Sequence, residues 1–274
     1  MTFQDFKFKE NLQKAIDEAG FKEPSPIQID AIPHILLGKD IVGQAHTGTG
    51  KTAAFGLPVL NQLTGKNAEA VVIVPTRELA MQVSDELFKF GKFLGINTAT
   101  VYGGQAYARQ LKLIETASVI VATPGRFLDL LKNGHIKIKP KFVILDEADE
   151  MLDMGFLDDI KEIFTYLPED RQTLLFSATM PVAIKNLAKT ILKEPEFVTI
   201  TKSDVTNKNI TQTYYVVDER ERDDALIRLF DYKNPKKLAE MLQDAWVGDK
   251  DDREAAVAVC LSADGCYHAH VALY

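Results

Sequence analysis

Short apolar runs alternate with longer segments of helical periodicity along the first 200 residues of the chain. In those longer segments apolar residues recur at the spacing of an amphipathic helix. The expected strands lie within residues 40–44, 70–76, 98–104, 117–124, 141–149, 172–179 and 196–200. They are mostly continuous apolar runs, which is typical of strands buried on both faces. The pattern predicts an α/β fold, with a mostly parallel sheet and helices on both of its faces.

Polar segments follow the expected strands and carry the candidate chemistry. In a sheet of this kind, ligands bind beyond the carboxyl ends of the strands. Five segments fall there: "GQAHTGTGKT", "PTREL", "TPGR", "DEAD" and "SAT". We therefore expect one functional rim, built from segments that are far apart in the sequence.

The segment "QAHTGTGKT", residues 44–52, follows a strand and begins a helix, as a phosphate-binding loop does. It departs from the common pattern G-x-x-x-x-G-K-[ST] at Ala45, where we expect a small side chain to be tolerated. The backbone N–H groups of a glycine-rich turn and the positive end of a helix both suit phosphate oxygens. We expect Lys51 to reach the terminal phosphates and the Thr52 hydroxyl to ligate Mg²⁺. The alternative is a glycine-rich turn before an ordinary helix.

Two adjacent carboxylates, Asp146 and Glu147, stand at the end of the apolar run "FVIL". Burying carboxylates at the end of an apolar strand costs free energy unless a cation compensates their charge or they serve a catalytic function. Asp146 would hold Mg²⁺ through water, and Glu147 would orient and deprotonate an attacking water. The alternative is an acidic helix start, because Asp and Glu favour the first turn of a helix.

The segments "PTREL" and "TPGR" each offer a helix start, a hydroxyl and an arginine, which suit sugar–phosphate contacts. "YGGQ", residues 102–105, adds bare backbone to the same rim. The alternative is helix capping by Thr76 and Thr123. In "FSAT", Ser177 and Thr179 can hydrogen-bond to the Asp149 carboxylate and so couple two sites, although the same letters also occur at ordinary strand ends.

"GFKEPSPIQ", residues 20–28, precedes the strand that leads into the phosphate-binding loop. Gln28 offers both a donor and an acceptor, which match the edge of adenine. Phe3 could cover the base. The alternative is a surface glutamine and a core phenylalanine.

Composition and charge narrow the class of protein. The chain is 46% hydrophobic and 26% charged, as soluble globular proteins are, and has no apolar run long enough to span a bilayer. Its first residues do not resemble a signal peptide. Both cysteines lie near the C-terminus, so we expect no disulfide framework and a cytoplasmic location. A net charge of −7 argues against a nonspecific nucleic-acid coat and favours a local patch.

Seven segments together carry a family resemblance. In order they are "GFKEPSPIQ", "AHTGTGKT", "PTREL", "GG", "TPGR", "DEAD" and "SAT". They closely resemble the DEAD-box ATP-dependent RNA helicases, especially bacterial members, over roughly residues 1–237. That family has alanine at the first position of the phosphate-binding loop. The resemblance implies a RecA-like P-loop NTPase that uses ATP and Mg²⁺ to separate short RNA duplexes.

The resemblance also implies roles for individual residues. Gln28 would recognise adenine, and Phe3 would pack nearby. The residues of the loop that would hold the phosphates are Thr47, Gly48, Thr49, Gly50, Lys51 and Thr52. The catalytic residues would be Glu147, Lys51 and Asp146, with Thr52 and Asp146 on Mg²⁺. The residues that would contact the RNA backbone are Pro75, Thr76, Arg77, Gly104, Thr123, Pro124, Gly125 and Arg126. Asp149, Ser177 and Thr179 would couple hydrolysis to strand separation. The family also allows RNA-processing or ribosome-assembly partners, with no role for a membrane.

The resemblance ends before the chain does. We expect a RecA-like ATP-binding domain over residues 1–203, a linker and the start of a truncated second RecA-like domain over 204–237, and a divergent tail over 238–274. The arginine-finger motif of the family, H-R-x-G-R-x-x-R, is absent from the sequence. The tail could be a frameshifted, truncated or fused end. The tail matches the spacing of a zinc site poorly at its candidate ligands, Cys260, Cys266, His268 and His270.

Three functions therefore remain open at the level of the sequence. The chain could be the ATP- and RNA-binding core of a helicase with weak activity alone. It could be a non-enzymatic fragment that binds RNA or a partner protein. A DNA-acting ATPase of related architecture is the third reading.

Overall fold

The computed structural model describes residues 1–65 and 67–200, and beyond them the short stretches 211–213, 224–225, 228, 255–261 and 267–273. The chain divides into two compact units, Met1–Thr201 and Lys202–Tyr274. The expected boundaries at residues 203 and 237 stay predictions, because most of residues 204–254 lies outside the described part.

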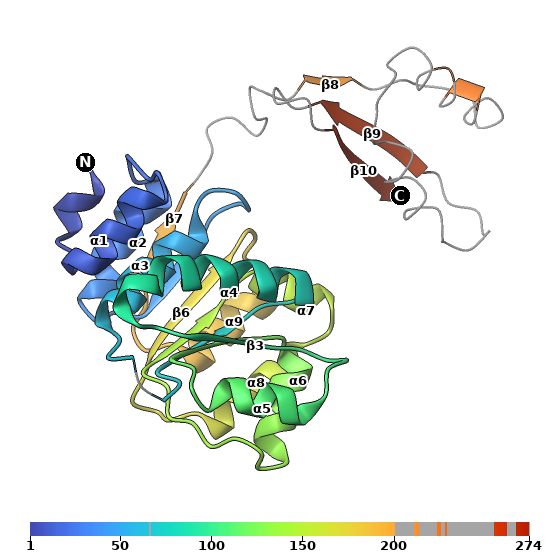
Figure 1. Cartoon of the computed structure of the whole chain (residues 1–274). Helices are drawn as coiled ribbons and strands as arrows, with labels where there is room; N and C mark the ends of the chain where they lie inside the picture. Colours follow the sequence, from blue (N-terminus) through green and yellow to red (C-terminus); the bar gives the residue numbers. More distant parts are fainter. Residues whose placement is uncertain are drawn as a thin grey trace. The chain divides into compact units, whose positions relative to one another are not determined.

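The first unit consists of alternating strands and helices (Figure 1). Its strands are β1 (Ile41–Gln44), β2 (Ala70–Ile73), β3 (Thr98–Val101), β4 (Val119–Ala122), β5 (Phe142–Leu145), β6 (Gln172–Ser177) and β7 (Glu196–Thr199). Its α-helices are α1 (Glu10–Glu18), α2 (Pro26–Leu36), α3 (Lys51–Gln62), α4 (Arg77–Gly91), α5 (Tyr107–Ile114), α6 (Pro124–Lys132), α7 (Ala148–Asp153), α8 (Leu157–Tyr166) and α9 (Val182–Ile191). Two short 3₁₀ helices, η1 (Phe3–Phe6) and η2 (Lys92–Leu94), complete it.

The seven strands form one sheet in the order β3-β4-β2-β5-β6-β1-β7. All of its pairs are parallel, with Ile41 opposite Leu174 and Ala70 opposite Phe142, for example. Each strand therefore ends at the same edge of the sheet, and a helix follows each of β1 to β6 there. The predicted α/β fold is confirmed, and the described part of this sheet is entirely parallel.

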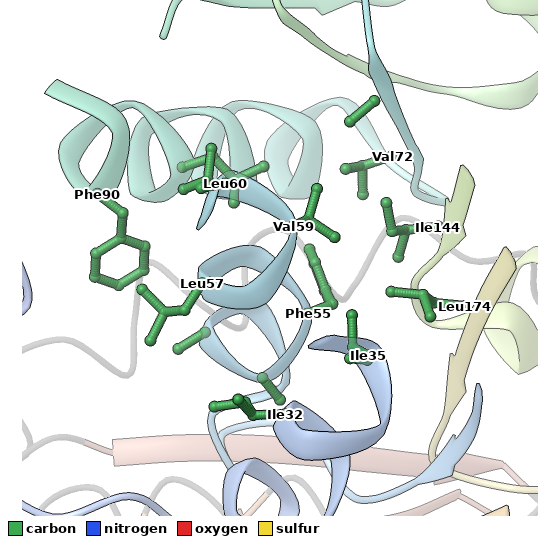
Figure 2. Close-up of a cluster of buried hydrophobic side chains, with 14 of the residues drawn as sticks. Ile32, Ile35, Phe55, Leu57, Val59, Leu60, Val72, Phe90, Ile144 and Leu174 are labelled. Carbon is green, nitrogen blue, oxygen red and sulfur yellow. The ribbon is translucent and has the colours of Figure 1, made fainter. Parts of the chain in front are cut away.

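Helices cover both faces, and the period of two along each strand separates two cores. In β5, Phe142 and Ile144 face the core beneath α1–α4, whereas Val143 and Leu145 face the core beneath α5–α9. Figure 2 shows the first of these cores, where residues from α2, α3 and α4 meet residues from the strands. The ring of Phe55 on α3 lies 5.5 Å from the ring of Phe176 on β6, measured between centroids. This packing fixes the start of α3, and with it the loop that precedes α3.

The second unit contains a three-stranded antiparallel sheet in the order β10-β9-β8. Its strands are β8 (Thr211–Thr213), β9 (Ala255–Leu261) and β10 (Tyr267–Leu273). Strands were expected from "ITQTYYVV" and "AAVAVCLSA", and β8 and β9 lie within these segments. Cys266 lies outside the described residues, as do the side chains of Cys260, His268 and His270. Of the helices within the described ranges, none is long and apolar enough to cross a membrane.

Candidate functional site

Loops from distant parts of the sequence meet at the carboxyl edge of the parallel sheet. Backbone hydrogen bonds join them beyond the strands. Ala45 N donates to Ser177 O at 3.1 Å, Val74 N to Ala122 O at 2.9 Å, and Asp146 N to Ile73 O at 3.0 Å. The single rim expected from the sequence is therefore present.

The loop between β1 and α3 has the conformation that its glycines allow. Gly48 and Gly50 have φ values of 80° and 87°, in the left-handed region that side chains disfavour. A Cβ on Gly50 would also lie 2.4 Å from the Gln28 side-chain nitrogen. Ala45 is buried and is not among the residues with positive φ. The first position of the motif therefore needs a small side chain here, but not the freedom of glycine.

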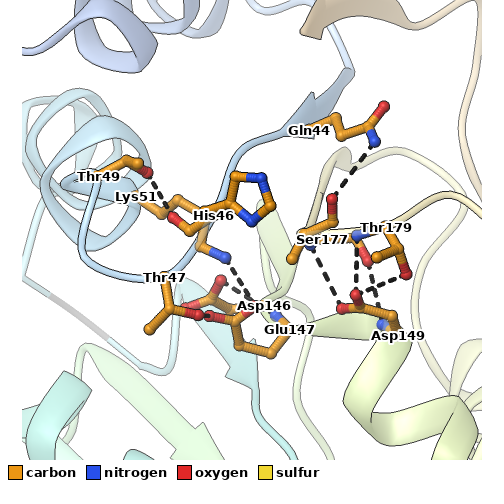
Figure 3. A network of polar contacts seen from close by, with 11 residues as sticks. Gln44, His46, Thr47, Thr49, Lys51, Asp146, Glu147, Asp149, Ser177 and Thr179 are labelled. Atoms are coloured by element: carbon orange, nitrogen blue, oxygen red, sulfur yellow. Dashed lines mark hydrogen bonds and ion pairs between the residues drawn. The ribbon is translucent and has the colours of Figure 1, made fainter. Parts of the chain in front are cut away.

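Lys51 and Glu147 form a buried ion pair at the centre of the rim (Figure 3). The Lys51 Nζ lies 2.6 Å from Glu147 Oε2, and both side chains are about 5% exposed. Thr47 donates its hydroxyl to Glu147 Oε1 at 2.9 Å. The phosphate-loop residues and the acidic segment after β5 are thus in direct contact, and a phosphate that binds Lys51 must compete with Glu147 for it.

Asp146 is a buried carboxylate with little compensation. Its pKa is raised to about 7 in all: burial raises it most, the nearby Lys51 lowers it in part, and the charge of Glu147 also raises it. Its Oδ1 accepts the Glu147 N–H at 3.1 Å. A carboxylate in this condition fits a neighbouring cation, which would compensate the buried charge.

One buried carboxylate beside the phosphate loop is compatible with magnesium bound together with a nucleotide. Among the residues that the structure describes, no three His, Cys, Asp or Glu side chains gather around a point. Magnesium bound with a nucleotide takes one or two carboxylates and completes its shell with phosphates and water. The Thr52 hydroxyl lies close enough to Glu86 on α4 to lower the pKa of Glu86, although burial outweighs it and leaves that pKa raised. A role for Thr52 on Mg²⁺ would require its hydroxyl to leave Glu86 and stays a prediction.

Glu147 has a strained backbone. Its φ and ψ are 54° and 53°, in the left-handed region. A non-glycine residue held there costs about 1–3 kcal/mol, and such residues cluster at active sites. The strain accompanies a sharp turn between β5 and α7, which directs the two neighbouring carboxylates into the rim.

Gln28 is held by two hydrogen bonds at the start of α2. Its Nε2 donates to Gly50 O at 3.0 Å, and its Oε1 accepts the Ser25 N–H at 2.9 Å. Gln28 is 3% exposed, so the alternative of a surface glutamine is wrong. The amide joins α2 to the phosphate loop, and adenine recognition by it stays a prediction.

Phe3 lies in an aromatic cluster. Its ring centroid is 6.1 Å from that of Phe6 and 5.9 Å from that of Phe21, and the side chain is buried. The structure therefore places Phe3 in the core, which agrees with the alternative of a core phenylalanine. A role for Phe3 near a base stays a prediction.

The "PTREL" and "YGGQ" segments lie side by side. The Thr76 hydroxyl accepts the Leu79 N–H at 3.2 Å, so Thr76 caps α4. A Cβ on Gly104, whose φ is 87°, would lie 3.4 Å from Arg77 Nη1. Arg77 is exposed, and Pro75 before it is buried. The expected capping by Thr76 is therefore present, and the exposed Arg77 lies next to the glycine loop.

The "TPGR" segment begins α6, with Pro124 in its first turn. Thr123 begins this helix without a side-chain capping bond. Gly125 is exposed. Arg126 Nη1 donates to Gln105 O at 2.9 Å and to Gln110 Oε1 at 3.1 Å. "TPGR" is thus bonded to the "YGGQ" loop.

The expected coupling contact is present in part. Thr179 donates to Asp149 Oδ2 through its hydroxyl and its N–H, each at 2.8 Å (Figure 3). The Ser177 hydroxyl oxygen accepts the backbone N–H of Asp149 at 3.1 Å. Partial burial alone would raise the pKa of Asp149, but the Ser177 and Thr179 groups around the carboxyl outweigh it and lower that pKa. The "SAT" segment is therefore bonded to α7, directly after the Asp146–Glu147 pair.

Comparison with known proteins agrees with this geometry. The sequence model described as "DEAD/DEAH box helicase" matches residues 25–187. This chain belongs to the DEAD/DEAH box helicase family. The matched range contains the phosphate loop, the acidic pair and the "SAT" segment.

Similar proteins include two bacterial helicases. The chain is 56% identical over 239 residues to "DEAD-box ATP-dependent RNA helicase RhpA" of Helicobacter pylori, which covers 86% of this chain and 49% of the relative. It is 47% identical over 240 residues to "DEAD-box ATP-dependent RNA helicase CshA" of Bacillus subtilis, with the same coverage. The chain thus spans about half the length of the curated relatives it matches.

Solved structures support the RecA-like fold of the helicase family. The crystal structure of a DEAD box protein from the hyperthermophile Methanococcus jannaschii aligns with a TM-score of 0.70 at 39% identity, over 90% of this chain and 71% of the other. A hypothetical ATP-dependent RNA helicase from Sulfolobus tokodaii aligns with a TM-score of 0.66 at 40% identity, over 70% of this chain and 57% of the other.

Proposed function

We propose that this chain is the ATP- and RNA-binding core of a bacterial, cytoplasmic RNA helicase. The observation that carries the proposal is the buried contact of Lys51 and Thr47 with Glu147, beside the buried Asp146, whose pKa is raised. Together with family membership, it favours a site for ATP and Mg²⁺. Residues 1–203 would form the ATP-binding domain, followed by the start of a second RecA-like domain and a divergent tail.

Nucleotide binding would exchange the contacts now made inside the site. A γ-phosphate would replace Glu147 as the partner of Lys51, and the N–H groups of residues 47–52 would surround the phosphates. Mg²⁺, held by Asp146 and Thr52, would neutralise charge on the phosphate oxygens. Glu147, released from Lys51, would then orient the attacking water and accept its proton.

RNA would bind along the neighbouring part of the rim. The candidates are the eight residues that the motifs supply: Pro75, Thr76, Arg77, Gly104, Thr123, Pro124, Gly125 and Arg126. Contacts of this type reach the sugar–phosphate backbone and carry no base code. The Asp149–Thr179 bonds join the acidic segment to "SAT" and would transmit the state of the nucleotide. RNA-processing or ribosome-assembly proteins are further candidate partners.

Equilibrium binding of fluorescent ATP tests the proposal. Lys51→Ala should raise the Kd for ATP at least about 30-fold, because a buried charged contact to phosphate is lost. Glu147→Gln is the matched control, since it keeps the lysine and should keep ATP binding while abolishing hydrolysis. Circular dichroism establishes that both variants fold. Unchanged affinity in Lys51→Ala would show that the proposed pocket is wrong.

The alternatives separate in two further measurements. Equal binding of RNA and DNA strands of the same sequence would favour the DNA-acting ATPase. Cellular effects that survive Glu147→Gln would favour the non-enzymatic fragment. The absence of the arginine-finger motif from the sequence also favours this alternative.

A further inference from the structure

A glutamine outside the recognised motifs lies beneath the proposed RNA-binding rim. Gln110, on α5, is 0% exposed. A buried amide is costly unless its donor and acceptor both have partners. The contacts that Gln110 makes therefore indicate why a polar side chain occupies the buried face of α5.

Both ends of the Gln110 amide bind parts of the rim. Its Nε2 donates to Tyr102 O at 2.7 Å, at the start of the "YGGQ" loop. Its Oε1 accepts from Arg126 Nη1 at 3.1 Å. The same Arg126 nitrogen donates to Gln105 O at 2.9 Å, at the end of that loop. Gln110 and Arg126 thus hold the loop at both of its ends.

Other contacts of the loop are made by its side chains, since Gln105 Nε2 donates to the Tyr102 hydroxyl and that hydroxyl lies 3.9 Å from Met81 Sδ. Gly103 and Gly104 lie between the two held carbonyls, and Gly104 has a φ of 87°. Two adjacent glycines have wide conformational freedom, so side-chain contacts must select one loop shape. The Arg126 guanidinium is also held in place, with its centre 4.5 Å from the ring of Tyr107.

We propose that Gln110 is a positioning residue for the RNA interface. It holds the backbone of residues 102–105 and the Arg126 side chain in one arrangement before RNA arrives. Preorganised contacts bind more tightly because less conformational entropy is lost on binding. This inference rests on the proposed RNA binding by the rim, and it adds a residue that does not itself touch RNA.

A second buried glutamine supplies the matched control. Gln172, at the start of β6, is 8% exposed and donates to Ile35 O at 3.1 Å and to Lys39 O at 2.6 Å. It also fixes backbone carbonyls, one in the last turn of α2 and one in the loop after it, but at the opposite edge of the sheet from the rim. Methionine matches glutamine closely in volume and lacks these hydrogen bonds. Gln110→Met and Gln172→Met therefore remove similar bonds at the two edges.

The experiment compares both variants with the parent in the full chain. The Kd for a single-stranded RNA and the Kd for fluorescent ATP are measured, together with the melting temperature. Limited digestion by chymotrypsin measures how often the loop opens in the absence of RNA, through the rate of cleavage after Tyr102.

Gln110→Met should raise the RNA Kd about tenfold and leave the ATP Kd unchanged. Its cleavage after Tyr102 should be about fivefold faster, because local opening becomes more frequent. Gln172→Met should change the melting temperature alone.

The outcomes that overturn the proposal are specific. The proposal is wrong if Gln110→Met binds RNA as tightly as the parent and is cleaved after Tyr102 at the same rate. It is also wrong if Gln110→Met and Gln172→Met lose RNA affinity equally, because general destabilisation would then explain both losses. If the parent itself does not bind RNA, the proposed function fails, and the cleavage rate still decides whether Gln110 positions the loop. If Gln110→Met does not fold, Gln110→Glu takes its place. It keeps the acceptor for Arg126, and its carboxylate cannot donate to Tyr102 O, so faster cleavage and weaker RNA binding are expected again.

Discussion

At the scale of single residues, the site combines two carboxylates whose surroundings differ. Glu147 is paired with Lys51 and bonded to Thr47, whereas the neighbouring Asp146 accepts one backbone N–H and has no such pair. Two adjacent acids in different environments can take different roles. Here Glu147 is suited to proton transfer once Lys51 binds phosphate in its place. Asp146 is suited to binding a cation.

The raised pKa of Asp146 predicts an unusual dependence of stability on pH. Its folded pKa of about 7 lies above the ordinary 3.8. The stability that this group contributes is therefore fully present below about pH 4 and is lost as pH rises through about 7. Asp146→Asn removes the buried charge, so its free energy of unfolding should rise relative to the parent's between about pH 4 and about pH 7. Urea unfolding in buffers with a chelator measures the difference.

Asp149 is the control for that experiment, because its pKa moves in the opposite direction. Hydrogen bonds from the "SAT" segment lower the pKa of Asp149. Its contribution to stability is present above the unfolded pKa and is lost as pH falls through the folded one. Asp149→Asn should therefore be less stable than the parent over that same pH range, with a nearly constant difference. A constant difference for Asp146→Asn as well would contradict the assigned burial of its charge.

At the scale of elements, the helix that begins at Lys51 carries the phosphate loop and anchors it in the core. Phe55 is 1% exposed and contacts Phe176 on β6, so the first turns of α3 are fixed against the sheet (Figure 2). Gln28 joins the start of α2 to the same loop through Gly50. The position of the loop therefore depends on α2, α3 and β6 together.

This packing predicts a large effect of one core substitution. Phe55→Ala should lower the free energy of unfolding by about 3–5 kcal/mol, through lost burial and the cavity that remains. Phe88→Ala is the control, because Phe88 lies on α4 with 51% of its surface exposed, and its effect should be within about 0.5 kcal/mol. Chemical denaturation followed by circular dichroism measures both. Similar losses in the two variants would show that the core beneath α1–α4 is described incorrectly.

Local patterns predicted the elements well, and long-range contacts explain what they missed. The apolar runs identified the strands of the first unit. The central strands β2, β4, β5 and β6 are buried along their whole length, whereas the edge strands β3 and β7 are only partly buried. The phosphate loop and the acidic pair were identifiable because each is contiguous in sequence. The burial of Phe3 and the Lys51–Glu147 pair depend on residues far away in the chain. Gln110 left one signal, a polar residue four positions before Ile114 on the buried face of the expected helix.

At the scale of the whole molecule, the chain spans about half the length of its curated relatives, and its sequence lacks the arginine-finger motif H-R-x-G-R-x-x-R. In phosphoryl transfer such an arginine stabilises charge in the transition state and contributes about 10³–10⁵ in rate. The groups that would bind ATP are present in the first unit. The motif that would supply the arginine finger is absent from the sequence, so its contribution to the rate is not expected from these residues. A polypeptide of these 274 residues should therefore bind ATP and RNA but hydrolyse ATP slowly.

This difference between binding and hydrolysis can be measured directly. The chain should bind ATP and single-stranded RNA, hydrolyse ATP slowly even with RNA in excess, and release little strand from a short duplex. Single-turnover hydrolysis and duplex release with labelled strands give the two rates. Glu147→Gln shows whether the residual hydrolysis belongs to this site, because a rate that survives the substitution must come from a contaminant or another site. Rapid strand release by the purified chain would contradict the prediction, since it would show that these residues do not need the arginine-finger motif for turnover.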